Sequence, residues 1–140
     1  MPELKGDLPV VRQEYESALK QVGTLGGGNH FIEIQKASDD YIWIMIHSGS
    51  RNIGYTAAKH YHELAKEKNE GRDDVPKDLA FFREDSEEYD LYMNEMNYCI
   101  DFALANRKLM MERVKDAFTD EVSDVEFSDF INKPHNFAAR

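Results

Sequence analysis

Three histidines of this chain lie beside predicted loops rather than inside a regular apolar pattern. His30 follows three glycines and Asn29, His47 ends an apolar segment, and His135 lies close to the last residue. Imidazole binds metal ions and exchanges protons near neutral pH. Where buried strands end beside glycine-rich turns, such groups are typical of ligand sites. The simpler interpretation of each histidine alone is a capped or partly exposed residue.

The tetrapeptide after the second histidine could bind an oxyanion. It reads Ser48-Gly49-Ser50-Arg51. Glycine lets backbone N–H groups point inward, the hydroxyls donate hydrogen bonds, and guanidinium adds a planar charged fork. The alternative is a turn that caps the next helix through Ser50 or Asn52.

Other polar side chains have simpler explanations. His60 and His62 lie on a predicted helix among charged neighbours, which indicates a surface position. Cys99 lies in the apolar face of another predicted helix, which favours core packing. Alternate residues of a strand point to opposite faces, so His30 and Glu33 can share a site only if the regular strand starts after His30.

The pattern of apolar residues predicts the elements that position these groups. Helical spacing predicts helices over Val10–Lys20 and Thr56–Glu67. Two strands joined by a hairpin loop over residues 37–40 are predicted at Phe31–Gln35 and Tyr41–Ile46. The second strand is apolar on both faces, which is typical of a strand covered on both sides.

A long helix is predicted to begin near Asp85 or Ser86, with Glu88 completing a capping box from Asp85. It could run to roughly 45 Å, and residues 120–132 could be strand or loop. We therefore expect a single domain over residues 1–140 with a mixed α/β (α+β) fold. Its sheet carries the strands around His30 and His47 and packs against the long helix.

Composition limits the possible functions. Lys and Arg number 17 against 27 Asp and Glu, for a net charge of −10. This charge argues against bulk electrostatic binding of nucleic acid, so any such contact must be local or shared with other polypeptide. The single cysteine suits a reducing compartment, and the longest apolar run, residues 42–46, is too short to cross a bilayer. Because no signal peptide is evident, we predict a cytoplasmic location and no membrane contact.

Four motifs together resemble the RtcB-type RNA-splicing ligases. The first begins at Gly23 and reads GTLGGGNHFIEI, and the second begins at His47 and reads HSGSRNIG. The third is FALANR at residues 102–107, and the fourth is HNFA at residues 135–138. They occur in the family's order and cover the chain from about Gly23 to its end, after a lead-in and helix over residues 1–22.

The resemblance implies an RNA ligase that joins an RNA 3′-phosphate or 2′,3′-cyclic phosphate end to a 5′-hydroxyl end. The family uses GTP and Mn²⁺, with two metal ions in its complete site. It passes GMP through a histidine adduct to the RNA 3′-phosphate. Phosphoryl transfer needs negative charge neutralised on the phosphate oxygens, which divalent ions supply.

The resemblance also implies roles for individual residues. The metal ligands would be His30, His47 and His135. The guanylate site would be lined by Asn29, His30, Phe31, Ile32, Glu33, His135 and Asn136. An RNA phosphate would be bound by Ser48, Ser50 and Arg51.

The chain departs from the family in what surrounds these motifs. The family's Asp and metal-bridging Cys lie well before the glycine-rich motif, whereas about twenty residues precede it here and include no Cys. The family's GMP-accepting histidine, with its guanine-contacting C-terminal residues, would lie beyond Arg140. No catalytic nucleophile is therefore assigned, and we expect this polypeptide alone neither to self-guanylylate nor to ligate.

Several interpretations are compatible with these departures. The central part of a ligase is expected to expose apolar surface and to self-associate. A stand-alone module derived from the ligase, which binds metal or phosphate, is expected to be a monomer or a symmetric dimer. An interaction protein without a site, and an unrelated hydrolase that uses His30 and Glu33, are the remaining alternatives.

Overall fold

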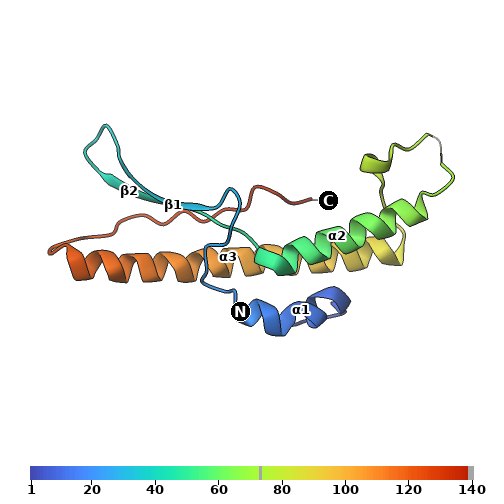
Figure 1. Cartoon of the computed structure of the whole chain (residues 1–140), viewed down its shortest axis with the longest axis horizontal. Coiled ribbons are helices and arrows are strands. Elements are labelled where there is room, and N and C mark those ends of the chain that lie inside the picture. Colours follow the sequence, from blue (N-terminus) through green and yellow to red (C-terminus); the bar gives the residue numbers. More distant parts are fainter. Residues whose placement is uncertain (73, 139–140) are drawn as a thin grey trace.

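The computed structural model describes residues 1–72 and 74–138. These residues form three α-helices, one 3-10 turn and a two-stranded antiparallel sheet (Figure 1). In chain order the elements are α1 (Pro9–Leu19), β1 (Phe31–Lys36), β2 (Ile42–His47), α2 (Arg51–Lys68), η1 (Lys77–Leu79) and α3 (Glu87–Glu121). The predicted mixed α and β fold, with a hairpin beside a long helix, is confirmed. No helix within the described ranges is long and apolar enough to span a membrane.

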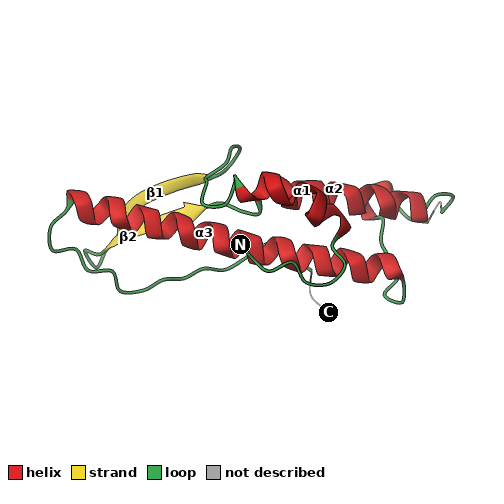
Figure 2. Cartoon of the chain, turned by 90° about the horizontal axis from the view of Figure 1, so that it is seen from below, coloured by secondary structure: helices red, strands yellow, loops and turns green. Residues whose placement is uncertain are grey.

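The long helix α3 is the axis of the molecule. Its 35 residues span about 52 Å at 1.5 Å per residue. Helix α2 lies along one half of α3 and the hairpin lies beside the other half (Figures 1 and 2). After α3 the chain turns back and runs along the helix as an irregular tail over residues 122–138, which contains no helix or strand. The open choice for residues 120–132 is thus settled as the end of α3 followed by loop.

The start of α3 differs in detail from the expected capping box. Ser86 is the N-cap, and its hydroxyl accepts a hydrogen bond from the Tyr89 backbone N–H at 3.2 Å. The predicted cap from Asp85 and Glu88 is wrong, because both carboxylates are paired elsewhere. Asp85 forms an ion pair with Arg83 at 3.0 Å, and Glu88 forms one with Lys68 of α2.

The hydrophobic core lies where α1, α2 and α3 meet. Its most buried apolar side chains include Val11 of α1, Ile53 of α2 and Phe102 of α3. Cys99 is also buried in this core, which confirms its predicted packing role. Each of the three helices carries a stripe of apolar residues that packs against the other two, so the helices hold together without further elements.

Buried Glu95 attaches α1 to α3. The amides of a helix's first turn have no partner within the helix, and Glu95 Oε1 accepts one from the Val11 backbone N–H at 2.7 Å. A negative charge at this position also suits the positive end of the α1 dipole. Glu95 Oε2 and the Tyr61 hydroxyl are buried without a hydrogen-bond partner. Burial, and then the nearby Glu95 carboxylate, raise the pKa of Tyr61, so its hydroxyl stays protonated.

The predicted hairpin is confirmed. In the antiparallel pairing, Phe31 lies opposite His47 and Ile34 lies opposite Ile44. The loop is closed by a hydrogen bond from the Ala37 backbone N–H to the Tyr41 carbonyl at 2.9 Å. Asp40, in the left-handed region at φ 66°, completes the turn.

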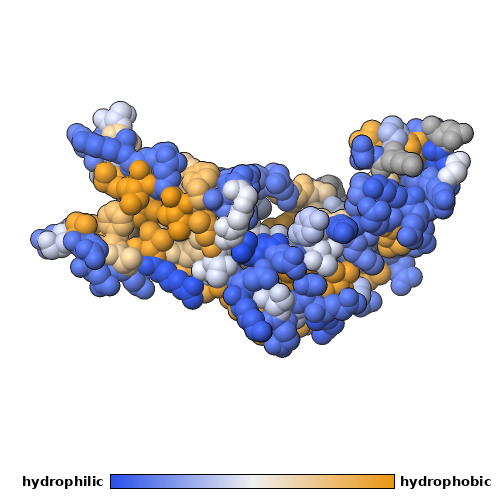
Figure 3. Space-filling view, viewed as in Figure 1, coloured by the Kyte–Doolittle hydropathy of each residue, from blue (hydrophilic) through white to orange (hydrophobic). Residues whose placement is uncertain are grey.

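The expectation that the second strand is covered on both sides is wrong. Ile42, Trp43 and Met45 of β2 are 53%, 47% and 44% exposed. The reason is that α3 and the tail are the described segments beside this hairpin, and together they cover it only in part. Figure 3 shows the resulting apolar area over the hairpin end of the molecule.

Helix α2 begins at Arg51, before the predicted start at Thr56. Its first turn contains the buried Ile53, which continues the four-residue spacing of Ala57, Tyr61 and Ala65, but Gly54 in the same turn weakens the helical signal in the sequence. This earlier start places Arg51 at the helix N-terminus, next to the turn that follows β2. His60 and His62, further along α2, are exposed as predicted.

Candidate functional site

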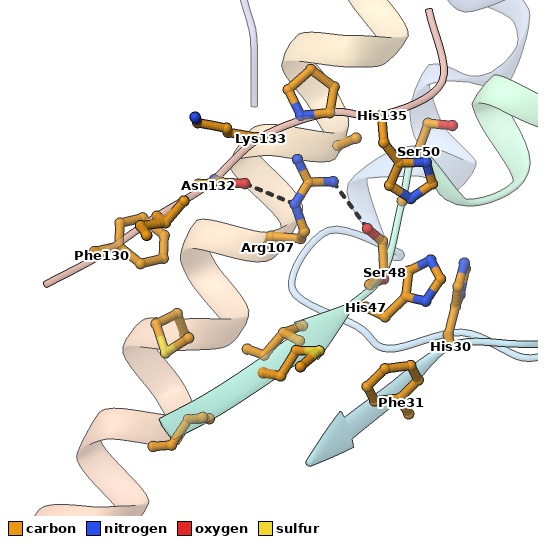
Figure 4. Close-up of a pocket in the computed structure, with 18 of the residues that line it drawn as sticks. His30, Phe31, His47, Ser48, Ser50, Arg107, Phe130, Asn132, Lys133 and His135 are labelled. Atoms are coloured by element: carbon orange, nitrogen blue, oxygen red, sulfur yellow. Dashed lines mark hydrogen bonds between the residues drawn. The ribbon is translucent and has the colours of Figure 1, made fainter. Parts of the chain in front are cut away.

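The three singled-out histidines come together in the structure (Figure 4). The ring centroids of His30 and His47 are 5.9 Å apart, and those of His47 and His135 are 5.5 Å apart. His30 ends the glycine-rich loop before β1, His47 ends β2, and His135 lies on the tail. Three segments that are distant in sequence therefore place their imidazoles in one row, with His47 in the middle.

These rings line a groove between the hairpin, the start of α2, α3 and the tail. Most of the predicted site residues line it, namely Asn29, His30, Phe31, His47, Ser48, Ser50, Arg51, His135 and Asn136. Ile32 and Glu33 do not belong to its lining. They lie along β1 opposite Ile46 and Met45, and Glu33 is exposed. Strand β1 begins at Phe31, so His30 precedes the strand and the condition for His30 and Glu33 to share a site is met. Glu33 nevertheless lies outside the groove.

Gly26 makes room for two of the site residues. Its φ is +94°, a left-handed value that glycine adopts without steric cost. A Cβ atom at this position would lie 1.8 Å from Arg51 Nη1 and 2.7 Å from His30 Nδ1. His30 Nδ1 is buried and has no hydrogen-bond partner. The glycine loop thus lets the guanidinium and the imidazole both lie against its backbone.

Arg51 is held by the loop before it in sequence. Its backbone is left-handed at φ 58°, and its Nε donates to Thr24 Oγ1 at 3.1 Å. The Asn52 backbone N–H donates to Gln21 Oε1 at 3.0 Å, so Gln21 caps the start of α2. The Ser50 side chain makes no capping hydrogen bond. Ser50 occupies the N-cap position of α2, as the alternative of a helix-capping turn expected, but without the side-chain cap, and Ser50 also lines the groove.

Ser48 serves the internal structure of the turn. It is 4% exposed, and its hydroxyl donates to the Leu25 carbonyl at 2.7 Å while accepting from Asn106 Nδ2 at 3.1 Å. Its hydroxyl is therefore already bound within the protein. Ser50 and Arg51 are the members of this tetrapeptide with side chains at the groove that are not fully engaged in this way.

Two residues of α3 belong to the site although their side chains had no predicted role. Asn106 is fully buried, and Arg107 lies at the groove with its Nη1 donating to the Ser48 carbonyl at 2.9 Å. A signal was present in the sequence: two adjacent polar residues interrupt the apolar face of a long helix. What they bind depends on contacts with distant segments, which periodicity does not reveal.

The donor chemistry suits a transition metal, although the geometry is not that of a formed metal centre. Within the described ranges no group of three or more His, Cys, Asp or Glu side chains is arranged to hold a metal ion. Two imidazoles bonded to one ion place their ring centroids about 5 Å apart, and the observed spacings are slightly wider. The unpartnered His30 Nδ1 and the clustering of three imidazoles fit a metal ligand set. Oxygen ligands that Mn²⁺ also favours would complete it.

Comparison with known proteins identifies the family. The sequence model described as tRNA-splicing ligase RtcB matches residues 3–140. The chain belongs to the RtcB family. The match includes α1 as well as the segments that carry the three histidines.

Individual relatives agree with this assignment. The RNA-splicing ligase RtcB of Escherichia coli K12 is 42% identical over 122 residues, which cover 82% of this chain and 30% of that protein. The tRNA-splicing ligase RtcB of Nanoarchaeum equitans is 33% identical over 114 residues, covering 70% of this chain and 24% of that protein. The Thermococcus kodakarensis protein of the same description is 29% identical over 139 residues, covering 84% and 29%. The chain thus spans less than a third of the length of these relatives.

Proposed function

We propose that this chain is part of a GTP- and Mn²⁺-dependent RNA ligase. The ligase joins an RNA 3′-phosphate or 2′,3′-cyclic phosphate end to a 5′-hydroxyl end, through histidine-bound GMP and an RNA 3′-guanylate. Membership of the RtcB family supports this function. The observation that carries it is the convergence of His30, His47 and His135, at ring spacings of 5.9 and 5.5 Å, from three separate motifs.

In this proposal the three histidines hold the metal. Bound divalent metal would neutralise charge on the phosphate oxygens during transfer. His47 and His30 are half-buried, whereas His135 is exposed on the tail. The positions of His47 and His30 are therefore fixed by the hairpin and the glycine loop. The position of His135 depends on how the tail lies against α3.

The nucleotide and phosphate groups would bind along the same groove. Asn29, Phe31, His135 and Asn136 line it and would contact the guanylate, and the Phe31 ring packs edge-on against His47 at 5.4 Å. Ile32 and Glu33, which belong to the same predicted set, lie outside the lining. The RNA phosphate would be bound by the Ser48–Arg51 turn, of which Ser50 and Arg51 line the groove.

The acidic charge of the chain restricts how RNA is bound. With a net charge of −10, long-range attraction for RNA is unfavourable. Recognition would therefore be local, through Arg51 and the metal, in a cytoplasmic enzyme. The exposed hairpin would contact further polypeptide or a second copy of the chain.

The metal part of the proposal is tested by calorimetric titration of the metal-free chain with Mn²⁺. The test variant is His30→Ala/His47→Ala, and the matched control is His60→Ala/His62→Ala, which removes two exposed histidines of α2. We expect saturable binding in the parent chain and in the control, and none in the test variant. The imidazoles that line the groove would then be the ligands.

Two results would contradict this. Binding that survives in the His30→Ala/His47→Ala variant would place the metal elsewhere. No binding by a parent chain that circular dichroism shows to be folded would mean that the three histidines do not suffice for a site. Strong binding in the absence of other polypeptide would also favour the stand-alone module.

A further inference from the structure

Asn106 of α3 binds both segments that carry the half-buried histidines. Its Oδ1 accepts from the backbone N–H groups of Gly23 at 2.7 Å and Thr24 at 3.2 Å, at the start of the glycine loop. Its Nδ2 lies 3.1 Å from Ser48 Oγ and 3.2 Å from the Gly49 carbonyl, in the turn after His47. A single buried amide therefore joins the loop that leads to His30 with the turn that follows His47.

Arg107 joins the same turn to the tail. Its Nη1 donates to the Ser48 carbonyl at 2.9 Å, and its Nε donates to Asn132 Oδ1 at 2.7 Å (Figure 4). Asn132 Nδ2 in turn donates to the Leu104 carbonyl of α3 at 2.9 Å. Asn132 is thus fixed from two sides, three residues before His135.

Both side chains are costly to bury, which requires an explanation. A buried amide destabilises the fold unless it is hydrogen-bonded, and a buried charge does so more strongly. Asn106 is fully buried, whereas Arg107 is half-buried, and this burial lowers the pKa of Arg107. Arg107 Nη2 is buried without a hydrogen-bond partner, so the bonds of Nε and Nη1 are those that offset the cost. No carboxylate forms an ion pair with Arg107 within residues 1–72 and 74–138. An apolar pair would suit this face of α3 if it had only to pack, so the bonds to the three segments account for the polar pair.

We propose that Asn106 and Arg107 are the positioning residues that align the three histidines of the groove. Asn106 sets the His30 loop against the end of β2, and Arg107 sets the His135 tail against the same point. The inference rests on the proposed function only in taking the three imidazoles to be one site. It assigns a role to the Asn-Arg pair of the third motif, which the proposed function leaves without one.

The two residues should act separately because they bind different segments. Losing Arg107 releases the tail, so His135 should move away from His47 while His30 stays. Losing Asn106 releases the glycine loop, so the contact between His30 and His47 should weaken first. An effect on the fold as a whole would disturb both contacts equally.

The test measures the ring contacts directly, by nuclear Overhauser effects between assigned histidine ring protons of the metal-free chain. The variants are Arg107→Met, Arg107→Lys and Asn106→Leu. Arg12→Met is the matched arginine control, because Arg12 of α1 also donates to a backbone carbonyl, that of Gly6 at 3.2 Å, which lies outside the segments that carry the histidines. Asn69→Leu is the asparagine control, since Asn69 binds the Ala65 and Phe81 carbonyls, both at 2.8 Å. Circular dichroism and urea unfolding report the fold of each variant.

We expect Arg107→Met to lose the His47–His135 contact and keep the His30–His47 contact. Arg107→Lys should lose only part of the His47–His135 contact, since lysine keeps the charge but lacks the planar fork whose two nitrogens bind Ser48 and Asn132. Asn106→Leu should reduce the His30–His47 contact, and both controls should keep both contacts. If Mn²⁺ binds the parent chain, Arg107→Met and Asn106→Leu should lower the affinity for Mn²⁺ about 10- to 100-fold, as changes beside metal ligands do.

The proposal is overturned if folded Arg107→Met and Asn106→Leu variants keep both ring contacts, or if the controls lose them as well. Should Arg107→Met fail to fold, full contacts in folded Arg107→Lys overturn the role of Arg107. Should Asn106→Leu fail to fold, full contacts in Asn106→Asp, which loses the Nδ2 donors, overturn that of Asn106. A parent chain with the contacts but no affinity for Mn²⁺ contradicts the proposed metal site and leaves the positioning role standing.

Discussion

At the residue scale, Gly26 decides whether Arg51 and His30 can approach the glycine loop. Replacing it with alanine would place a Cβ atom 1.8 Å from Arg51 Nη1, at a backbone φ of +94°. We expect Gly26→Ala to lower the free energy of unfolding by about 1–2 kcal/mol from the backbone conformation alone. Displacement of Arg51 from Thr24 adds to this loss. Urea unfolding measures the first effect, and the chemical shifts of the His30 ring report the second.

Two neighbouring glycines separate these causes. Gly28 also has a positive φ, at +75°, but a Cβ atom there would meet nothing within 4 Å. Gly27 has no positive φ, and a Cβ atom there would likewise meet nothing within 4 Å. Gly28→Ala should therefore show the backbone cost without any shift of His30, and Gly27→Ala should show little change. Equal losses in all three variants would mean that the Arg51 and His30 contacts do not explain the role of Gly26.

The residues of the site were partly predictable. The three histidines and the Ser48–Arg51 turn could be found from sequence because each lies within a recognisable motif beside a loop. The hydrogen bonds that occupy the Ser48 hydroxyl, and those of Asn106, could not be predicted, since they depend on segments more than twenty residues away. Hydrogen bonds between distant segments leave no local pattern.

At the element scale, periodicity predicted what depends on the local sequence. The short helix, the hairpin with its loop and the long helix were all found, because each has its own apolar spacing or turn residues. The coverage of β2 was mispredicted because the apolar residues of a strand show only that it can be buried. Its actual burial depends on which segments lie beside it. The earlier start of α2 was missed because Gly54 lies in its first turn and because Gln21, from another segment, supplies the hydrogen bond that caps it.

The packing of α3 against α2 should make stability depend on alkaline pH. Cys99 lies beside Gly54 of α2, and burial, then the Glu95 carboxylate, raise the pKa of its thiol from 9.0 to about 12. Burial likewise raises the pKa of Tyr98 to about 12. The folded state keeps protons that the unfolded chain releases, so this stability is complete below pH 9 and is lost as pH rises toward 12.

Cys99→Ala tests this dependence. The variant is less stable at neutral pH because a side chain is shortened in the core, but its stability should fall less between pH 9 and pH 12. The measurement is the free energy of unfolding in urea at several pH values, with the slope against pH as the readout. The Tyr98 contribution should remain in both proteins. Identical slopes would show that the thiol does not titrate differently on folding.

At the scale of the whole molecule, the helices and the hairpin differ in how well they are covered. The helical half has its own core, whereas the hairpin exposes apolar side chains on both of its faces, at the end of the molecule where Figure 3 shows an apolar area. The strand pairing places Ile32, Ile34 and Ile42 together on one face, here called the hairpin patch, and Trp43 and Met45 on the other. This hairpin patch belongs to a two-stranded sheet, so the outer edge of each strand is also without a strand partner in the described residues. Apolar patches and free strand edges are the features through which proteins associate.

We therefore expect the isolated chain to self-associate through the hairpin patch as its concentration rises. Because the net charge of −10 opposes contact between copies, association should strengthen with added salt. Light scattering after size-exclusion chromatography measures the mass at each protein and salt concentration. Ile34→Lys/Ile42→Lys, which places two charges on the hairpin patch, should suppress the association.

The control for this double variant makes the same change of charge elsewhere. Tyr55 and Leu79 are 67% and 68% exposed outside the hairpin, so Tyr55→Lys/Leu79→Lys adds two lysines at exposed apolar positions without touching the patch. Association that persists in this control and disappears in the hairpin variant assigns the contact to the patch. A monomer at all concentrations would contradict the prediction. A dimer of fixed mass would instead favour a stand-alone module over one part of a larger ligase.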